Sequence, residues 1–92
     1  MQRFSKEEAA SRLGTLPGWQ IEAGELTRTF TFKDFIAALA FVNRLGDQAE
    51  QAGHHPDIDI RYNRVRLSLV THDAGGLTAK DFELAAAVDK LA

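Results

Sequence analysis

The sequence contains no cysteine, and it has only two prolines, one methionine and one tryptophan among its 92 residues. Without cysteine the fold has no disulfide and no thiolate chemistry, so side-chain packing must supply its stability. No stretch approaches the roughly 20 apolar residues that a membrane-spanning helix needs. Because the N-terminus also lacks the apolar run of a signal peptide, we expect a cytoplasmic protein that does not enter a membrane.

An excess of charge of either sign is also missing. The chain carries 11 basic and 13 acidic residues, which gives a net charge of −2. This balance argues against broad electrostatic binding of nucleic acid. The apolar fraction of 45% is ordinary for a globular domain. We therefore expect one domain over residues 1–92, with a small core that self-association could supplement.

The spacing of apolar residues predicts seven elements of secondary structure. Helical spacing predicts helices over about 6–13, 34–52 and 79–91, and alternation predicts strands over 19–22, 25–32, 57–62 and 64–72. Capping signals at Ser5 with Glu8, and at Thr78 with Asp81, support the first and last helices, and Gly53 ends the long one. The order α-β-β-α-β-β-α predicts an α+β domain, a four-stranded antiparallel sheet with three helices packed on one face.

The other face of this sheet carries polar side chains, so it faces solvent or a ligand. They are Thr27, Thr29, Arg64, Arg66 and Ser68.

The long helix has a wider apolar arc than one sheet needs to cover. Its apolar and small residues are Phe35, Ala38, Leu39, Phe41, Val42, Leu45, Gly46 and Ala49. A wide arc indicates burial on more than one side. Either the helix is deeply buried within this chain, or it covers the sheet and also contacts another subunit, a role that Phe41 and Leu45 would serve.

All three histidines fall in two short stretches, Gly53-His54-His55-Pro56-Asp57 and Thr71-His72-Asp73. The strand period and the hairpin register bring the two stretches to one end of the sheet. Histidine titrates near neutral pH, so clustered imidazoles can supply both a general acid and a general base.

The same residues also fit roles other than acid–base catalysis. A lone surface histidine usually has no function, and three histidines could bind zinc. Zinc is disfavoured because the neighbours His54 and His55 tend to diverge and no HxxxH or HxH pattern is present. Glu50 could hydrogen-bond an imidazole or be a solvated helix residue. Trp19 is more simply explained as a core residue, and Asp81 as a helix cap.

Around these histidines the sequence resembles the pterin-4a-carbinolamine dehydratase family. The resemblance rests on residues 50–57, 62–65 and 69–73, followed by Gly76-Leu77-Thr78 and Asp81. It extends over nearly the whole chain, because Trp19 and Phe32-Lys33-Asp34-Phe35 also match. Family members often carry an acidic residue at the position of Gly53 and an aromatic residue at that of Ile58. Neither departure removes a titrating group.

The resemblance implies dehydration of a 4a-hydroxytetrahydropterin to the quinonoid dihydropterin, which recycles the cofactor of aromatic amino-acid hydroxylases. No metal or organic cofactor is implied. His54 and His72 would be acid/base groups, and His55 would bind and orient the pterin. The remaining implied substrate-site residues are Glu50, Pro56, Thr71, Asp73 and Trp19. Glu50 would support the histidines, and Trp19 would lie near the rim of the pocket.

The expected partners are the pterin substrate and further copies of the chain, which would form a dimer or a tetramer. An aromatic amino-acid hydroxylase is a further candidate partner. The alternative is a dimerising protein-interaction or transcriptional-cofactor module with little catalysis, because vertebrate relatives also dimerise a homeodomain transcription factor. Relatives that have lost the histidines are assembly factors, and this chain keeps all three.

Overall fold

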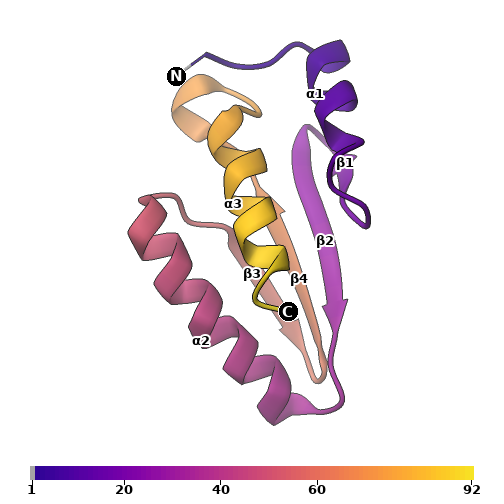
Figure 1. Ribbon diagram of the computed structural model, residues 1–92, viewed down its shortest axis with the longest axis vertical. Coiled ribbons are helices and arrows are strands. Elements are labelled where there is room, and N and C mark those ends of the chain that lie inside the picture. The colour runs from indigo at the N-terminus through magenta and orange to yellow at the C-terminus, as the bar shows by residue number, and fades with distance from the viewer. Residues whose placement is uncertain (1) are drawn as a thin grey trace.

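The computed structural model describes residues 2–92 and confirms the predicted α+β fold (Figure 1). Its elements are α1 (Lys6–Leu13), β1 (Gln20–Glu22), β2 (Glu25–Thr31), α2 (Phe35–Ala52), β3 (Asp57–Arg61), β4 (Arg64–Leu69), the short 3₁₀ helix η1 (His72–Ala74) and α3 (Ala79–Asp89). Ser5 caps α1 by accepting a hydrogen bond from the Glu8 N–H, which is one half of the predicted capping box, and Thr78 with Asp81 forms a complete capping box. No helix within residues 2–92 is long and apolar enough to cross a membrane.

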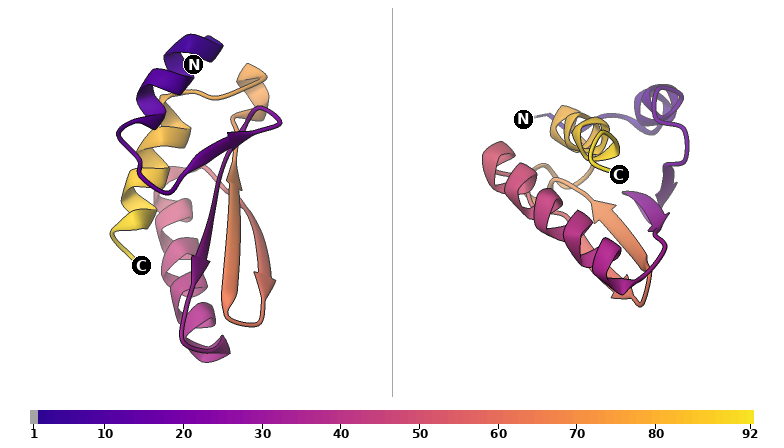
Figure 2. Two further views of the ribbon diagram at one scale, coloured as in Figure 1. Left: turned by 90° about the vertical axis from the view of Figure 1, so that its right-hand side faces the viewer. Right: turned by 60° about the horizontal axis from the view of Figure 1, so that its bottom comes forward.

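The four strands form one antiparallel sheet in the order β1-β2-β4-β3. The two hairpins therefore join through β2 and β4, where Leu26 lies opposite Leu69 and Phe30 lies opposite Val65. The left view of Figure 2 shows the helices on one side of this sheet and the other side uncovered. As a result, one face is apolar and packed, and the other is open.

The last strand ends earlier than its alternating pattern predicts. β4 stops at Leu69, and the predicted continuation to His72 is wrong. The chain instead folds back, with an isolated bridge between Thr71 and Gly76. His72 begins η1, which ends at Gly75 with a φ of 74°. This left-handed conformation favours glycine, so the Gly75-Gly76 pair allows the tight reversal.

Arg28 interrupts the apolar side of β2 without entering the core. Its guanidinium lies over the ring of Phe30, 4.4 Å from the centroid, and pairs with Asp89 at 3.0 Å. The same carboxylate accepts the indole N–H of Trp19 at 2.9 Å. Trp19 is only 4% exposed, so it is a core residue, as its sequence context suggested.

The apolar arc of α2 divides into a buried side and an exposed side. Phe41 and Leu45 are fully buried, and the Phe41 ring centroid lies 4.9 Å from those of both Phe30 and Phe32. By contrast, Phe35 is 43% exposed and Ile36 is 72% exposed. The interpretation that Phe41 and Leu45 serve a subunit interface is therefore wrong, because both are fully buried in this chain's own core.

Replacing Phe41 by Leu is expected to lower the free energy of unfolding by about 1–2 kcal/mol, because the smaller side chain leaves its aromatic neighbours unpacked. Denaturant titration would measure the loss. Ile36→Leu is the matched control, since the exposed Ile36 side chain loses little packing. Equal stabilities of the two variants would contradict the burial of Phe41.

Candidate active site

All three histidines line one hollow of about 280 Å³. The other lining residues are Gly53, Val70, Thr71, Asp73 and Lys80. They come from the end of α2, from the segment after β4, from η1 and from the first turn of α3. The predicted meeting of the histidines at one end of the sheet is therefore confirmed.

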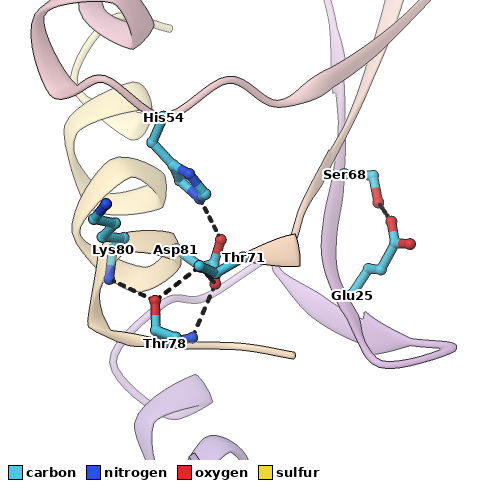
Figure 3. Close-up of polar contacts among 7 residues, drawn as sticks. All are labelled: Glu25, His54, Ser68, Thr71, Thr78, Lys80 and Asp81. Carbon is cyan, nitrogen blue, oxygen red and sulfur yellow. Dashed lines mark hydrogen bonds and ion pairs between the residues drawn. The ribbon is translucent and has the colours of Figure 1, made fainter. Parts of the chain in front are cut away.

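His54 follows directly on the turn that ends α2. Gly53 adopts a φ of 64°, and the His54 N–H donates to the Ala49 carbonyl at 3.2 Å. This αL turn reverses the chain direction, so the imidazole reaches α3. The His54 Nε2 atom lies 2.5 Å from Oδ1 of Asp81 (Figure 3). The His54 side chain is 11% exposed and that of Asp81 is completely buried.

The buried Asp81 carboxylate has a partner on each oxygen. Its Oδ2 accepts the Thr78 N–H and the Thr71 hydroxyl, both at 2.9 Å. The Thr71 and Thr78 hydroxyl oxygens lie 2.8 Å apart. Within residues 2–92 no buried side-chain nitrogen or oxygen lacks a hydrogen-bond partner. A buried polar network is stabilising when every member is paired, so these side chains hold one another in fixed positions.

The directions of these hydrogen bonds determine the tautomer of His54. Because a carboxylate only accepts, Thr71 donates its single hydroxyl proton to Asp81, and Thr78 donates to Thr71. For the same reason the His54 Nε2 atom carries a proton and donates it to Asp81. The Nδ1 atom of the neutral ring is then free to accept a proton.

The other two histidines are held less firmly. The Nε2 atom of His55 contacts Oε2 of Glu50, so Glu50 hydrogen-bonds an imidazole as predicted, although the partner is His55 and not His54. Both side chains of that pair are largely exposed, and an exposed pair orients its members only weakly. His72 is exposed on η1. The site therefore combines one buried, oriented imidazole with two that water reaches.

Some of the residues that the resemblance implied lie outside this hollow. Thr71 and Asp73 line it, whereas Glu50, Pro56 and Trp19 do not, and Glu50 reaches it only through its contact with His55. Trp19 lies in the core beside Phe30, with ring centroids 6.1 Å apart. Pro56 is half-buried in the segment between His55 and β3.

Two residues of the site were not assigned to it from the sequence. Lys80 lines the hollow, and Asp81 orients His54. Asp81 does cap α3, as predicted, but the cap uses only its Oδ2 atom. A capping carboxylate leaves its second oxygen free for another partner. At the end of the sheet where the histidines meet, that free oxygen is the signal that could have identified Asp81 as a site residue.

The arrangement suits proton transfer. An imidazole whose tautomer is fixed lies beside two imidazoles that solvent reaches, and such groups can accept and donate protons. Within residues 2–92, no group of three or more histidine, aspartate or glutamate side chains is placed to hold a metal ion.

Comparison with known proteins adds to this geometry. A sequence model of the family described as "Pterin 4 alpha carbinolamine dehydratase" matches residues 2–91. A protein of Acidobacterium capsulatum is 57% identical over 99% of both chains, and one of Chloroflexus aurantiacus is 59% identical over 99% of this chain and 98% of its own. Both carry the name "Putative pterin-4-alpha-carbinolamine dehydratase".

Two solved structures are also similar. The "transcriptional coactivator/pterin dehydratase" from Brucella melitensis has a TM-score of 0.94 and 35% identity, over 99% of each chain. A "pterin dehydratase-like protein" described as a RuBisCO assembly factor in the alpha-carboxysome has a TM-score of 0.65 and 27% identity. That match covers 79% of this chain and 84% of the other.

Proposed function

Because the chain belongs to the pterin 4 alpha carbinolamine dehydratase family, we propose that it dehydrates a 4a-hydroxytetrahydropterin to the quinonoid dihydropterin and water. The observation that carries the proposal is the hollow lined by three histidines, one of which a buried carboxylate orients. Family membership supplies the dehydratase chemistry, and this site supplies groups able to perform it.

The reaction requires two proton transfers. The C4a–O bond breaks, the departing hydroxyl takes up a proton and leaves as water, and a ring N–H gives up its proton as a C=N bond forms. Positioned acids and bases typically accelerate such transfers by about 10²–10⁴-fold each. The reaction is a redox-neutral loss of water that needs only acid and base groups, so we propose that no metal or organic cofactor takes part.

The geometry supports a different role for each histidine. We assign His54 as the base, accepting the ring proton at Nδ1, because Asp81 holds its Nε2–H and stabilises the imidazolium that forms. We assign His72 as the acid for the leaving hydroxyl, since an exposed imidazole regains its proton from water. His55, paired with Glu50, would contact and orient the pterin.

The test is the dehydration of freshly generated 4a-hydroxytetrahydropterin, followed by ultraviolet absorbance. Wild-type protein is expected to raise the rate above that of the spontaneous reaction, in proportion to protein concentration. A well-folded wild type without acceleration would contradict the proposed activity. In the cell the product would re-enter the cofactor cycle of an aromatic amino-acid hydroxylase.

We further propose that the protein is a homo-oligomer. The exposed large apolar side chains lie on the edge strand β3, at its turn and at the start of α2, namely Phe35, Ile36, Ile58, Ile60 and Tyr62. An edge strand also presents unpaired backbone groups to a second chain. A second copy that covers this surface would bury it from water.

Replacing Ile58 and Ile60 together by Lys is expected to reduce the particle mass toward the 10.2 kDa of one chain, because two charges would have to be buried at the interface. Light scattering after gel filtration would measure the mass. Exchanging Gln20 and Thr29 for Lys adds the same charge on the open face of the sheet and is the control. A monomeric wild type, or an unchanged mass of the double variant, would contradict the proposal.

The second candidate function is a protein-interaction module with little catalysis. The exposed apolar surface on β3 and α2 could equally contact another protein. The names of the two similar structures also include a transcriptional coactivator and an assembly factor. The retained histidines favour the enzyme, and the dehydration assay separates the two functions.

A further inference from the structure

The open face of the sheet gathers arginines near the β3–β4 turn. The strand register places Arg61 directly opposite Arg64, and Arg66 opposite Asp59. Side chains two residues apart on one strand share a face, so these three guanidinium groups and the Asp59 carboxylate project together. On the other flank of β4, Thr29 lies opposite Arg66. The face is uncovered by the helices (Figure 2, left view).

These five residues line a hollow of about 240 Å³. Its lining contains three arginines and one aspartate, and with the Glu22 carboxylate that bonds Arg66 the local excess is one positive charge. The whole chain has a net charge of −2, so the positive charge is concentrated here and is not a property of the general surface.

Two of the three guanidinium groups are anchored by carboxylates. The Arg61 Nε–H donates to Asp59 at 3.3 Å, and an Nη2–H of Arg66 donates to Glu22 at 3.2 Å. The hydrogen bond from the Thr27 hydroxyl, and to a lesser extent the one from Arg66, lowers the pKa of Glu22 below its ordinary value. Glu22 therefore remains an anionic anchor. Each guanidinium has five N–H donors, so both anchored arginines keep donors free.

Arg64 is the uncompensated member of the cluster. Among residues 2–92 no carboxylate forms an ion pair with it, although it lies across from Arg61. Like charges directly opposite on neighbouring strands destabilise a sheet. An anion seated between the guanidinium groups would remove this repulsion.

We propose that this hollow, lined by Thr29, Asp59, Arg61, Arg64 and Arg66, binds a phosphate group, either as inorganic phosphate or as the phosphate of a small phosphomonoester. Phosphate fits because its oxygens accept several N–H bonds at once, and guanidinium forks match that geometry. The Thr29 hydroxyl can donate a further bond. The Asp59 carboxylate disfavours larger polyanions that would have to pass close to it.

The proposed site is separate from the histidine hollow. Asp57 begins β3 near the histidines, and Arg61 ends it. Four residue steps along a strand span about 13 Å. The phosphate site does not depend on the proposed dehydratase activity, and changes to Arg64 should leave that activity intact.

The test is a titration of the full chain with inorganic phosphate, observed by NMR of backbone amides and arginine side chains at constant pH and ionic strength. Glycerol 3-phosphate forms a second arm, and chloride is the reference anion. We expect saturable shifts at the β3–β4 hairpin with both phosphate probes. Arg64→Gln should weaken the binding by at least about fivefold. Lys90→Gln removes the same charge outside the hollow and should leave binding within about twofold.

Each outcome decides the proposal. Stronger binding of glycerol 3-phosphate than of inorganic phosphate would identify a phosphomonoester as the ligand, and the reverse order would identify free phosphate. Shifts no larger than those with chloride, shifts centred away from the hairpin, or equal losses in Arg64→Gln and Lys90→Gln would overturn it. The circular dichroism spectrum of Arg64→Gln should match that of wild type, since this side chain is on the surface.

Discussion

Replacing His54 by Gln together with His72 by Ala is expected to lower the protein-catalysed rate of pterin dehydration by about 10²–10⁴-fold or more, because both proposed proton-transfer groups are lost. The dehydration assay measures the effect directly. The single variants separate the two roles.

The choice of glutamine at position 54 follows from the structure. From sequence position alone, both histidines project from the end of the sheet, and a double alanine variant should fold normally. His54 is in fact 11% exposed and bonded to a fully buried carboxylate. Alanine would leave an Asp81 oxygen unpaired, at a cost of about 1–3 kcal/mol, whereas glutamine can still donate to it.

Added imidazole provides a control for chemistry as opposed to folding. His72 is exposed, so free imidazole can reach the space that His72→Ala creates and should restore part of the rate. Rescue of His54→Gln should be much smaller, since glutamine fills most of that space. A folded double variant that retains the wild-type rate would refute histidine catalysis.

Replacing Asp81 by Asn is expected to lower the dehydration rate by about 10–100-fold with little loss of folded protein. The amide has nearly the shape of the carboxylate but can no longer accept on both sides. If the amide oxygen keeps the bonds to Thr71 and Thr78, the amide NH₂ group faces His54 and no longer holds its Nε2–H tautomer. If the amide oxygen faces His54 instead, the bonds to Thr71 and Thr78 are lost. Asp81 is thus a positioning residue that acts through His54.

Asp81→Ala should have a different and larger structural effect. It leaves the Thr71 hydroxyl, the Thr78 N–H and the His54 ring without their buried partner, and it removes half of the capping box of α3. Each buried donor that is left without a partner typically costs about 1–3 kcal/mol. Thermal or denaturant unfolding would measure the loss.

A matched control distinguishes positioning from general damage. Asp89→Asn makes the same chemical change at a half-buried aspartate that bonds Trp19 and Arg28 instead of a histidine. It should destabilise modestly and leave the rate per folded molecule unchanged. Nitrogen-15 chemical shifts of the imidazole rings report the tautomer. An Asp81→Asn variant with the wild-type tautomer and rate would contradict the positioning role.

The order of the elements could be predicted because it depends on local spacing. Alternation along a strand and recurrence along a helix are written in neighbouring residues, as are the caps at Ser5 and Thr78. The gathering of His54 and His72 also follows locally, since one hairpin of known register joins them. The fold class and the composition of the histidine cluster were therefore determined by the sequence itself.

Only the tertiary structure decided which sides of these elements meet. The apolar arc of α2 could not show that Phe41 faces the sheet while Ile36 faces outward, because both residues are apolar and the packing of the sheet chooses between them. His54 and Asp81 are 27 residues apart and meet because the turn after α2 and the start of α3 arrive at the same end of β4. Contacts between distant segments depend on how whole elements pack, so the buried pair that fixes the proposed base was not contained in any local pattern.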